Sequence, residues 1–134
     1  MAMPRHAIAL SFALMLAIAG CGGGNDKSEV ESTVRDFVKA TNDRDTGKWC
    51  GGLVTKEFLE QATGATGDEA KSACKEQLKS LKRPSLRLIR IDRVKIDGDK
   101  ATATATLDTQ GQRAPQTFRL KKQDGDWRIT TGSG

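Results

Sequence analysis

The hydrophobic pattern changes its period once along the chain, at Pro84, and this change limits the folds that the sequence can adopt. Before Pro84, apolar residues recur every three or four positions, which predicts amphipathic helices. After Pro84, which cannot continue a helix, apolar and polar residues alternate, which predicts β-strands joined by turns. The order indicates an α+β domain: N-terminal helices packed in a curved, mostly antiparallel sheet of four or slightly more strands.

The helical half divides into an opening helix and shorter segments. The opening helix is expected over residues 29–41, started by a capping box in Ser28–Glu31. A short helical turn is expected over residues 48–53, and the last helix is expected to end near Leu81 before Pro84. Two further residues are expected as N-caps of the later helices: Thr55 and Asp68.

The second half predicts four strands. The first covers residues 86–96 and requires a bulge or two, because its apolar residues change phase. The second alternates alanines and Leu107 with threonines, the third is expected over residues 117–122, and the fourth starts at Trp127. Three turn signals separate them: Asp97-Gly98-Asp99, Gln110-Gly111-Gln112 and Asp124-Gly125-Asp126.

The first residues have the pattern of an export signal. Arg5 and His6 precede the apolar run Ala7–Ala19, whose thirteen residues are fewer than the roughly 20 that a membrane-spanning helix needs. The next residues, Ile18-Ala19-Gly20-Cys21, resemble a bacterial lipobox. An ordinary secretory signal that happens to contain a cysteine is the alternative.

The lipobox resemblance implies a domain organisation and a location. Residues 1–20 would be a lipoprotein signal peptide, and Cys21 would carry a diacylglyceryl group at the new N-terminus. Residues 21–27 would then be a glycine-rich lipidated tether, followed by the folded domain over residues 28–134. We therefore expect an extracytoplasmic protein that is lipid-anchored to the bacterial cell membrane.

Two cysteines remain when Cys21 is lipidated. Outside the cytoplasm, leftover cysteines usually pair, so a Cys50–Cys74 disulfide is predicted. The alternative is a reactive or metal-binding thiol pair. The only histidine, His6, lies in the predicted signal peptide and is not available to activate a thiolate. We expect no metal and no cofactor.

Two segments of the second half carry a family resemblance. Val94–Ala103 resembles a strand–hairpin–strand unit, and Phe118–Ile129 resembles a closing hairpin. Together with the opening helix and Cys74, they make the chain similar to the nuclear-transport-factor-2-like superfamily, also called ketosteroid-isomerase-like, and to its small bacterial lipoproteins of unknown function. The resemblance implies a cone-shaped fold with a pocket at its open end. Isomerases, dehydratases, hydrolases and non-catalytic binders share this fold, so the resemblance supports the fold more than a function.

The residues for the known chemistry of such pockets are missing. Isomerases of this superfamily combine a carboxylate with tyrosine, certain dehydratases and cyclases combine aspartate with histidine, and the chain has no tyrosine and no histidine beyond His6. A hydrolase site of the Asp–Arg–Asp type, with carboxylates from Asp92 and Asp108, is left as an alternative. Asp92 is the one acidic residue in a strand of apolar alternation, between Arg90 and Arg93. It is either a pocket base or, as such residues more often are, a surface ion-pair partner.

The aromatic residues either line a pocket for an apolar ligand or fill a small core. The candidate pocket residues are Phe37, Trp49, Phe58, Asp92 and Phe118. A second group of residues is basic, and it either contacts anionic headgroups or is a solvated helix face. The candidate membrane-facing residues are Lys71, Lys75, Lys79, Lys82 and Arg83. Aromatic residues do not interleave with this group, so we do not expect nucleic-acid binding.

The sequence therefore predicts a membrane-tethered, non-catalytic binding or interaction module. Its partner would be a small apolar ligand or an envelope protein, and a homodimer is left open. One alternative is a small-substrate enzyme of the hydrolase or isomerase type that uses Asp92. The other is a structural spacer of the cell envelope.

Overall fold

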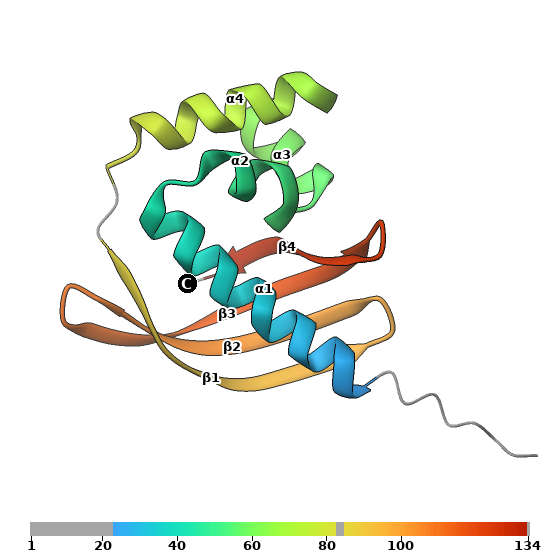
Figure 1. Ribbon diagram of the computed structural model, residues 1–134, viewed down its shortest axis with the longest axis vertical. Coiled ribbons are helices and arrows are strands. Elements are labelled where there is room, and N and C mark those ends of the chain that lie inside the picture. Colours follow the sequence, from blue (N-terminus) through green and yellow to red (C-terminus); the bar gives the residue numbers. More distant parts are fainter. Residues whose placement is uncertain (1–22, 83–84, 134) are drawn as a thin grey trace, which may run out of the picture.

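A computed structural model describes residues 23–82 and 85–133 of the chain. Helices come first and four strands follow, with α1 against one face of the curved sheet and α4 outermost (Figure 1). The helical elements are α1 (Gly23–Asp43), α2 (Thr46–Lys48), the π-helical turn η1 (Trp49–Leu53), α3 (Lys56–Thr63) and α4 (Gly67–Ser80). The strands are β1 (Leu86–Asp97), β2 (Lys100–Thr109), β3 (Gln112–Gln123) and β4 (Asp126–Ser133). This arrangement confirms the predicted α+β fold class.

The sheet is an antiparallel meander in the order β1-β2-β3-β4. The register of β1 on β2 shifts twice, between Leu88 and Arg90 and between Ile91 and Arg93, which confirms the predicted bulges. Bulges bend a strand and increase its twist. The two shifts therefore curve the edge of the sheet around α1.

Small side chains on β2 let α1 approach the sheet closely. Ala101, Ala103 and Ala105 are buried, as the alternation with threonine predicts. From α1, Val30 and Val34 contribute the facing side chains, and both are fully buried. The core is thus a thin layer of valine on alanine here, and the rings of Phe37, Trp49 and Phe118 pack together beside the C-terminal half of α1.

The start of α1 differs from the prediction. The helix begins at Gly23, so Ser28 lies inside it and the expected capping box does not start it. Asp26 stands in the first turn, where the helix dipole favours a carboxylate, and it binds Lys122 Nζ at 3.1 Å and Trp127 Nε1 at 3.2 Å. These contacts with the sheet explain why residues 23–27, predicted as a coil, are helical despite their glycines.

Two other boundaries were also predicted wrongly. The N-cap of α4 is Thr66 rather than Asp68. The end of α4 at Ser80 agrees with the predicted end near Leu81, which lies just outside the helix and is 41% exposed. β3 begins at Gln112, five residues before the predicted start. Pro115 fits within β3 because β4 ends opposite Thr117, so no neighbour on that side needs the N–H that proline lacks.

Candidate functional site

A hollow of about 350 Å³ lies at one end of the domain, next to the turn between β2 and β3. It is bordered by the C-terminal half of α1, by η1 and α3, and by the strand ends that carry Leu86, Thr109 and Ala114. Four of the five predicted pocket residues line it: Phe37, Trp49, Phe58 and Phe118. The sequence therefore identified most of the aromatic lining, although these residues come from four different elements.

The four rings form a continuous series along the hollow. The ring centroids of Phe58 and Trp49 are 5.8 Å apart, those of Trp49 and Phe37 are 5.3 Å apart, and those of Phe37 and Phe118 are 5.8 Å apart. The rings are tilted or edge-on to one another, the arrangement that aromatic pairs prefer. Each ring is thereby held in place by its neighbour and still borders the open space.

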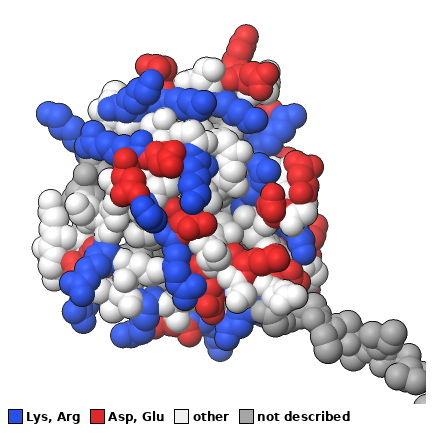
Figure 2. Space-filling view, viewed as in Figure 1, with Lys and Arg blue, Asp and Glu red and all other residues white. Residues whose placement is uncertain are grey.

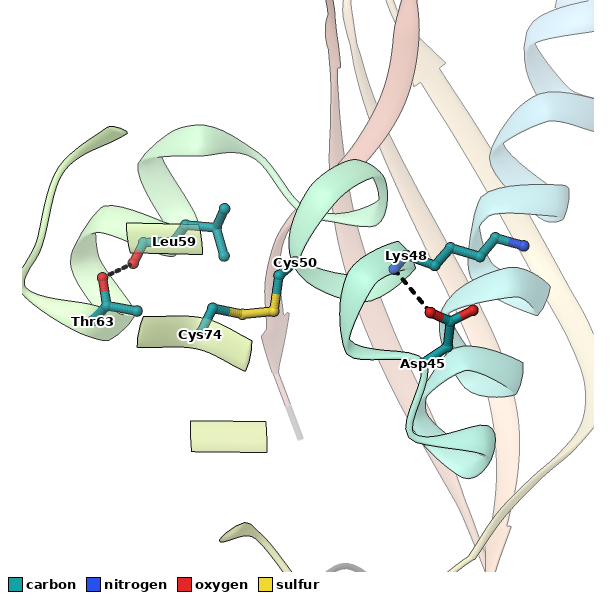
Figure 3. Close-up of a disulfide and its surroundings, with 6 residues drawn as sticks. All are labelled: Asp45, Lys48, Cys50, Leu59, Thr63 and Cys74. Carbon is teal, nitrogen blue, oxygen red and sulfur yellow. Dashed lines mark hydrogen bonds between the residues drawn. A yellow bond between two sulfur atoms is a disulfide. The ribbon is translucent and has the colours of Figure 1, made fainter. Parts of the chain in front are cut away.

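Local hydrogen bonds place Trp49 and Phe58 in this series. The Asp45 side chain accepts a hydrogen bond from the Lys48 amide at 3.0 Å and caps the short α2, from which η1 continues with Trp49 (Figure 3). A π-helical turn such as η1 is rare in proteins and is often found at functional sites. Phe58 is held by the predicted cap of α3, since the buried Thr55 hydroxyl accepts a hydrogen bond from the Phe58 amide at 3.2 Å.

The β4 edge supports the same segment. Val54 forms a parallel bridge with Ile129, and the Thr55 amide donates to the Ile129 carbonyl at 3.0 Å. Ile129 itself lines the hollow. The segment that joins η1 to α3 is therefore fixed on the sheet, and the aromatic side chains on either side of it have a rigid support.

The predicted disulfide is formed at Cys50, the residue that follows Trp49. Cys50 and Cys74 are joined, with their Cα atoms 6.0 Å apart, and the bond links η1 to α4 (Figure 3). α4 packs mainly on α3, α2 and η1 rather than on the sheet. The disulfide thus ties the outermost helix to the wall of the hollow, and it excludes the alternative of a free thiol pair.

The polar groups around the hollow are few. Thr109 and Gln116 line it, and the indole Nε1 of the buried Trp49 has no hydrogen-bond partner within the described part of the chain. No aspartate, glutamate, lysine or arginine belongs to the described lining. A buried donor without a partner destabilises the fold.

Asp92 does not lie in the hollow, which corrects its prediction as a pocket residue. It stands on the outer face of the sheet, where Thr106 Oγ1 donates to its carboxylate at 2.7 Å and Arg90 forms an ion pair with it. These two hydrogen bonds, that of Thr106 first, hold the pKa of Asp92 below its ordinary value. A pocket base needs a raised pKa, so neither the position nor the electrostatics of Asp92 support that role.

The predicted basic residues on α4 are exposed. Lys71, Lys75 and Lys79 lie on this helix and Lys82 follows it, and lysine and arginine side chains form a band over α4 (Figure 2). Arg83, like the predicted lipidation site Cys21, lies outside the described residues. α4 and the first turn of α1 are at opposite ends of the molecule (Figure 1). The band therefore does not lie on the side where the chain enters the domain.

Two absences apply to residues 23–82 and 85–133. No helix there is both long and apolar enough to cross a membrane. The same residues contain no cluster of three or more histidine, cysteine, aspartate or glutamate side chains that could hold a metal ion.

Comparisons with solved structures place the fold. The domain is similar to an NTF-2-like protein of unknown function from Shewanella oneidensis, with a TM-score of 0.54 and 19% identity over 80% of this chain and 96% of that one. It is also similar to an NTF2-like protein of unknown function from Shewanella baltica, with a TM-score of 0.54 and 14% identity over 81% and 90% of the two chains. A third, from Nostoc punctiforme, has a cystatin-like fold, a TM-score of 0.53 and 15% identity over 81% and 89%. At these identities the likeness shows the fold alone, and it agrees with the predicted cone-like α+β fold.

A sequence family also matches. Residues 25–133 fit the model of the family described as "Putative lumazine-binding", and the chain belongs to this family. No curated protein matches the sequence.

Proposed function

We propose that this member of the family binds a small, planar, largely apolar molecule in the aromatic hollow, without chemical conversion, and that a lipid on Cys21 holds it at the outer side of a bacterial membrane. The observation that carries the proposal is the series of four rings around about 350 Å³ of space. This volume falls within the roughly 300–1,000 Å³ typical of small-molecule sites. The description of the family adds a heteroaromatic ring system, lumazine, as the first ligand to test.

The lining supports binding rather than catalysis. Its described residues are apolar or aromatic, with Thr109 and Gln116 as polar members, and general acid–base chemistry needs a titratable group in reach of the ligand. The site thus presents several aromatic faces and few polar groups, which suits recognition of a molecule that itself contains a ring.

The anchor is supported by the sequence motif of residues 1–21, and the position of α1 indicates which way an anchored domain would face. The helix starts two residues after Cys21 and its 21 residues span about 30 Å. The hollow is bordered by the C-terminal half of α1, whose first turn is pinned to the β3–β4 hairpin through Asp26. An anchored domain would therefore present the hollow away from the bilayer, toward ligands in the surrounding aqueous space.

Tryptophan fluorescence tests the binding proposal. The chain has two tryptophans, and Trp127→Phe leaves Trp49 as the single reporter. We expect a lumazine or a similar flat heteroaromatic compound to quench Trp49 with a saturable curve. Ala114→Phe places a ring at the rim of the hollow and should weaken binding, because the added side chain occupies ligand space.

The matched control is Arg113→Phe, which adds the same ring to the residue of β3 that precedes Ala114. Adjacent strand residues point to opposite faces, so this ring would lie outside the hollow. Equal binding by both variants would refute the hollow as the site. Release of a chemically altered ligand after incubation would refute the non-catalytic assignment and leave the binding site intact.

The anchor has a separate test. Intact-mass analysis of membrane-extracted protein should show a diacylglyceryl adduct on a chain that starts at Cys21, and Cys21→Ser should abolish it. A soluble form that is cut elsewhere and carries a free Cys21 thiol would contradict the anchor without bearing on the hollow.

A further inference from the structure

A second cleft, of about 550 Å³, lies on the other side of the segment that joins η1 to α3. It is bordered by the first turn of α4, by the turn between β3 and β4, and by α3. Three cationic side chains line it: Lys56, Lys71 and Arg128. The sequence did not predict that these three residues form one site, because they come from three separate elements.

Arg128 is the most informative of the three. It sits on β4 between the buried Trp127 and Ile129, so its side chain leaves the strand on the face opposite the core. Its Nε is inaccessible to solvent and has no hydrogen-bond partner in the part of the chain that the structure describes. A buried guanidinium N–H without an acceptor is destabilising. Arg128 lines the cleft and forms no ion pair with a described carboxylate, so an oxyanion in the cleft would be the charged partner of its guanidinium group.

The other two cations are not neutralised by strong pairs. Lys71 forms no ion pair with any described carboxylate, and the closest carboxylate oxygen to Lys56 Nζ is that of Glu60 at 3.9 Å. Both lysines are exposed. Both ammonium groups are therefore available to a ligand, whereas elsewhere on α4 the Lys79 ammonium is held by Glu76 at 3.2 Å.

Part of the remaining lining of the cleft is apolar. Val54, Leu59 and Ala70 are buried residues that border it, with Cys50 of the disulfide beside them. A site of this volume is far larger than an inorganic anion needs, since a water molecule takes about 30 Å³. The apolar part of the lining would instead contact the body of an organic molecule.

We propose that this cleft binds a small organic anion, with its carboxylate or phosphate on Arg128 and Lys71 and its apolar body on Val54, Leu59 and Ala70. The site is separate from the aromatic hollow and does not depend on the ligand proposed there. Two carboxylates, Asp68 and Asp124, also line the cleft and leave one net positive charge among its five charged side chains. They oppose the anion, so their removal should strengthen binding.

Titration with three probes tests the proposal: phenyl phosphate, benzoate and inorganic phosphate, at constant ionic strength. We expect phenyl phosphate or benzoate to bind more tightly than inorganic phosphate, because only the aromatic probes contact the apolar part of the lining. Whichever aromatic probe binds more tightly identifies the head group, phosphate or carboxylate, that Arg128 binds. Failure of both aromatic probes to bind at millimolar concentration would overturn the proposal.

Variants locate the binding. Arg128→Gln and Lys71→Gln should each weaken the tighter aromatic probe about tenfold, the loss expected for one charged hydrogen bond, and Asp68→Asn should tighten it. Lys75→Gln is the matched control, because Lys75 is an exposed lysine on α4 that does not line the cleft. An equal dissociation constant for Lys71→Gln and Lys75→Gln would overturn the proposal. Both lysines are exposed, so this comparison stays valid even where Arg128→Gln fails to fold.

A further variant separates the two cavities. Phe58→Leu changes the aromatic hollow and leaves the lining of the cleft intact. Binding of the aromatic anion should be unchanged in this variant. A loss confined to Phe58→Leu would assign the anion to the hollow and refute the second site.

Discussion

Reduction of the Cys50–Cys74 bond should destabilise the domain by about 3.5 kcal/mol. The two cysteines are 24 residues apart, and the chain-entropy relation for a closed loop of that length gives this value at about 25 °C. For a domain of this size, the loss corresponds to a fall in melting temperature of roughly 15 °C. The value is large against a typical total stability of about 5–15 kcal/mol.

Chemical denaturation with and without a thiol-free reductant measures this change. Cys50→Ala/Cys74→Ala is the control, because it cannot respond to the reductant and reports the same loss through mutation. The loss should begin at α4, since this helix packs mainly on α2, α3 and η1 and is tied to the wall of the hollow by the bond itself. Amide exchange should therefore accelerate in α4 before it accelerates in the sheet.

A fall of less than about 1 kcal/mol would refute the entropic reasoning, because it would mean that the residues between the cysteines stay close together in the unfolded chain. Equal acceleration of exchange in α4 and β2 would refute the local part of the argument.

Three further changes have defined outcomes. Thr55→Ala removes the acceptor of the Phe58 amide and should cost about 1 kcal/mol in the free energy of unfolding by urea. Asp26→Asn should lower the melting temperature at neutral pH, because hydrogen bonds, that of Lys122 first, depress the pKa of Asp26. A depressed carboxyl pKa stabilises the fold above the ordinary aspartate value, near pH 4, and this contribution is lost as the pH falls through the folded-state pKa. The gap between the two melting curves should therefore close in acid, and a gap independent of pH would contradict the assignment. Asp92→Asn should leave ligand binding in the hollow unchanged in the fluorescence titration, and a loss of binding would place Asp92 in the site after all.

The sequence predicts the sheet well because its signals are local. The alternation of Ala101, Ala103 and Ala105 with threonines defines one buried face, and glycine turns such as Gly98 and Gly125, both at positive φ, define the hairpins. The disulfide follows from the cysteine count and the expected compartment. The aromatic lining is also partly predictable, since a small domain has few places for its large side chains.

The start of α1 could not be read from the sequence, because it depends on contacts between distant residues. Gly23 and Gly24 are poor helix formers, and a capping box lies closer to the first apolar residue. What extends the helix is the pair of bonds from Asp26 to Lys122 and Trp127, about a hundred residues later. The charged cleft was missed for the same reason, because it is assembled from α3, α4 and β4.

The position of Asp92 shows that a bulge interrupts the alternation of inward and outward side chains along a strand. Ile91 pairs with Ala105 and Arg93 pairs with Thr104, so Asp92 is the extra residue of the second bulge and is opposite no residue of β2 in the register. An insertion of one residue exchanges the two faces of a strand. Flanking apolar residues therefore say little about which way Asp92 points, and its hydrogen bond with Thr106 shows that it faces outward. The bulges that curve β1 around the core therefore also place Asp92, the predicted pocket carboxylate, outside the hollow. The remaining lining is mostly aromatic and aliphatic, and it is suited to holding a ligand through contact with the aromatic rings of the protein.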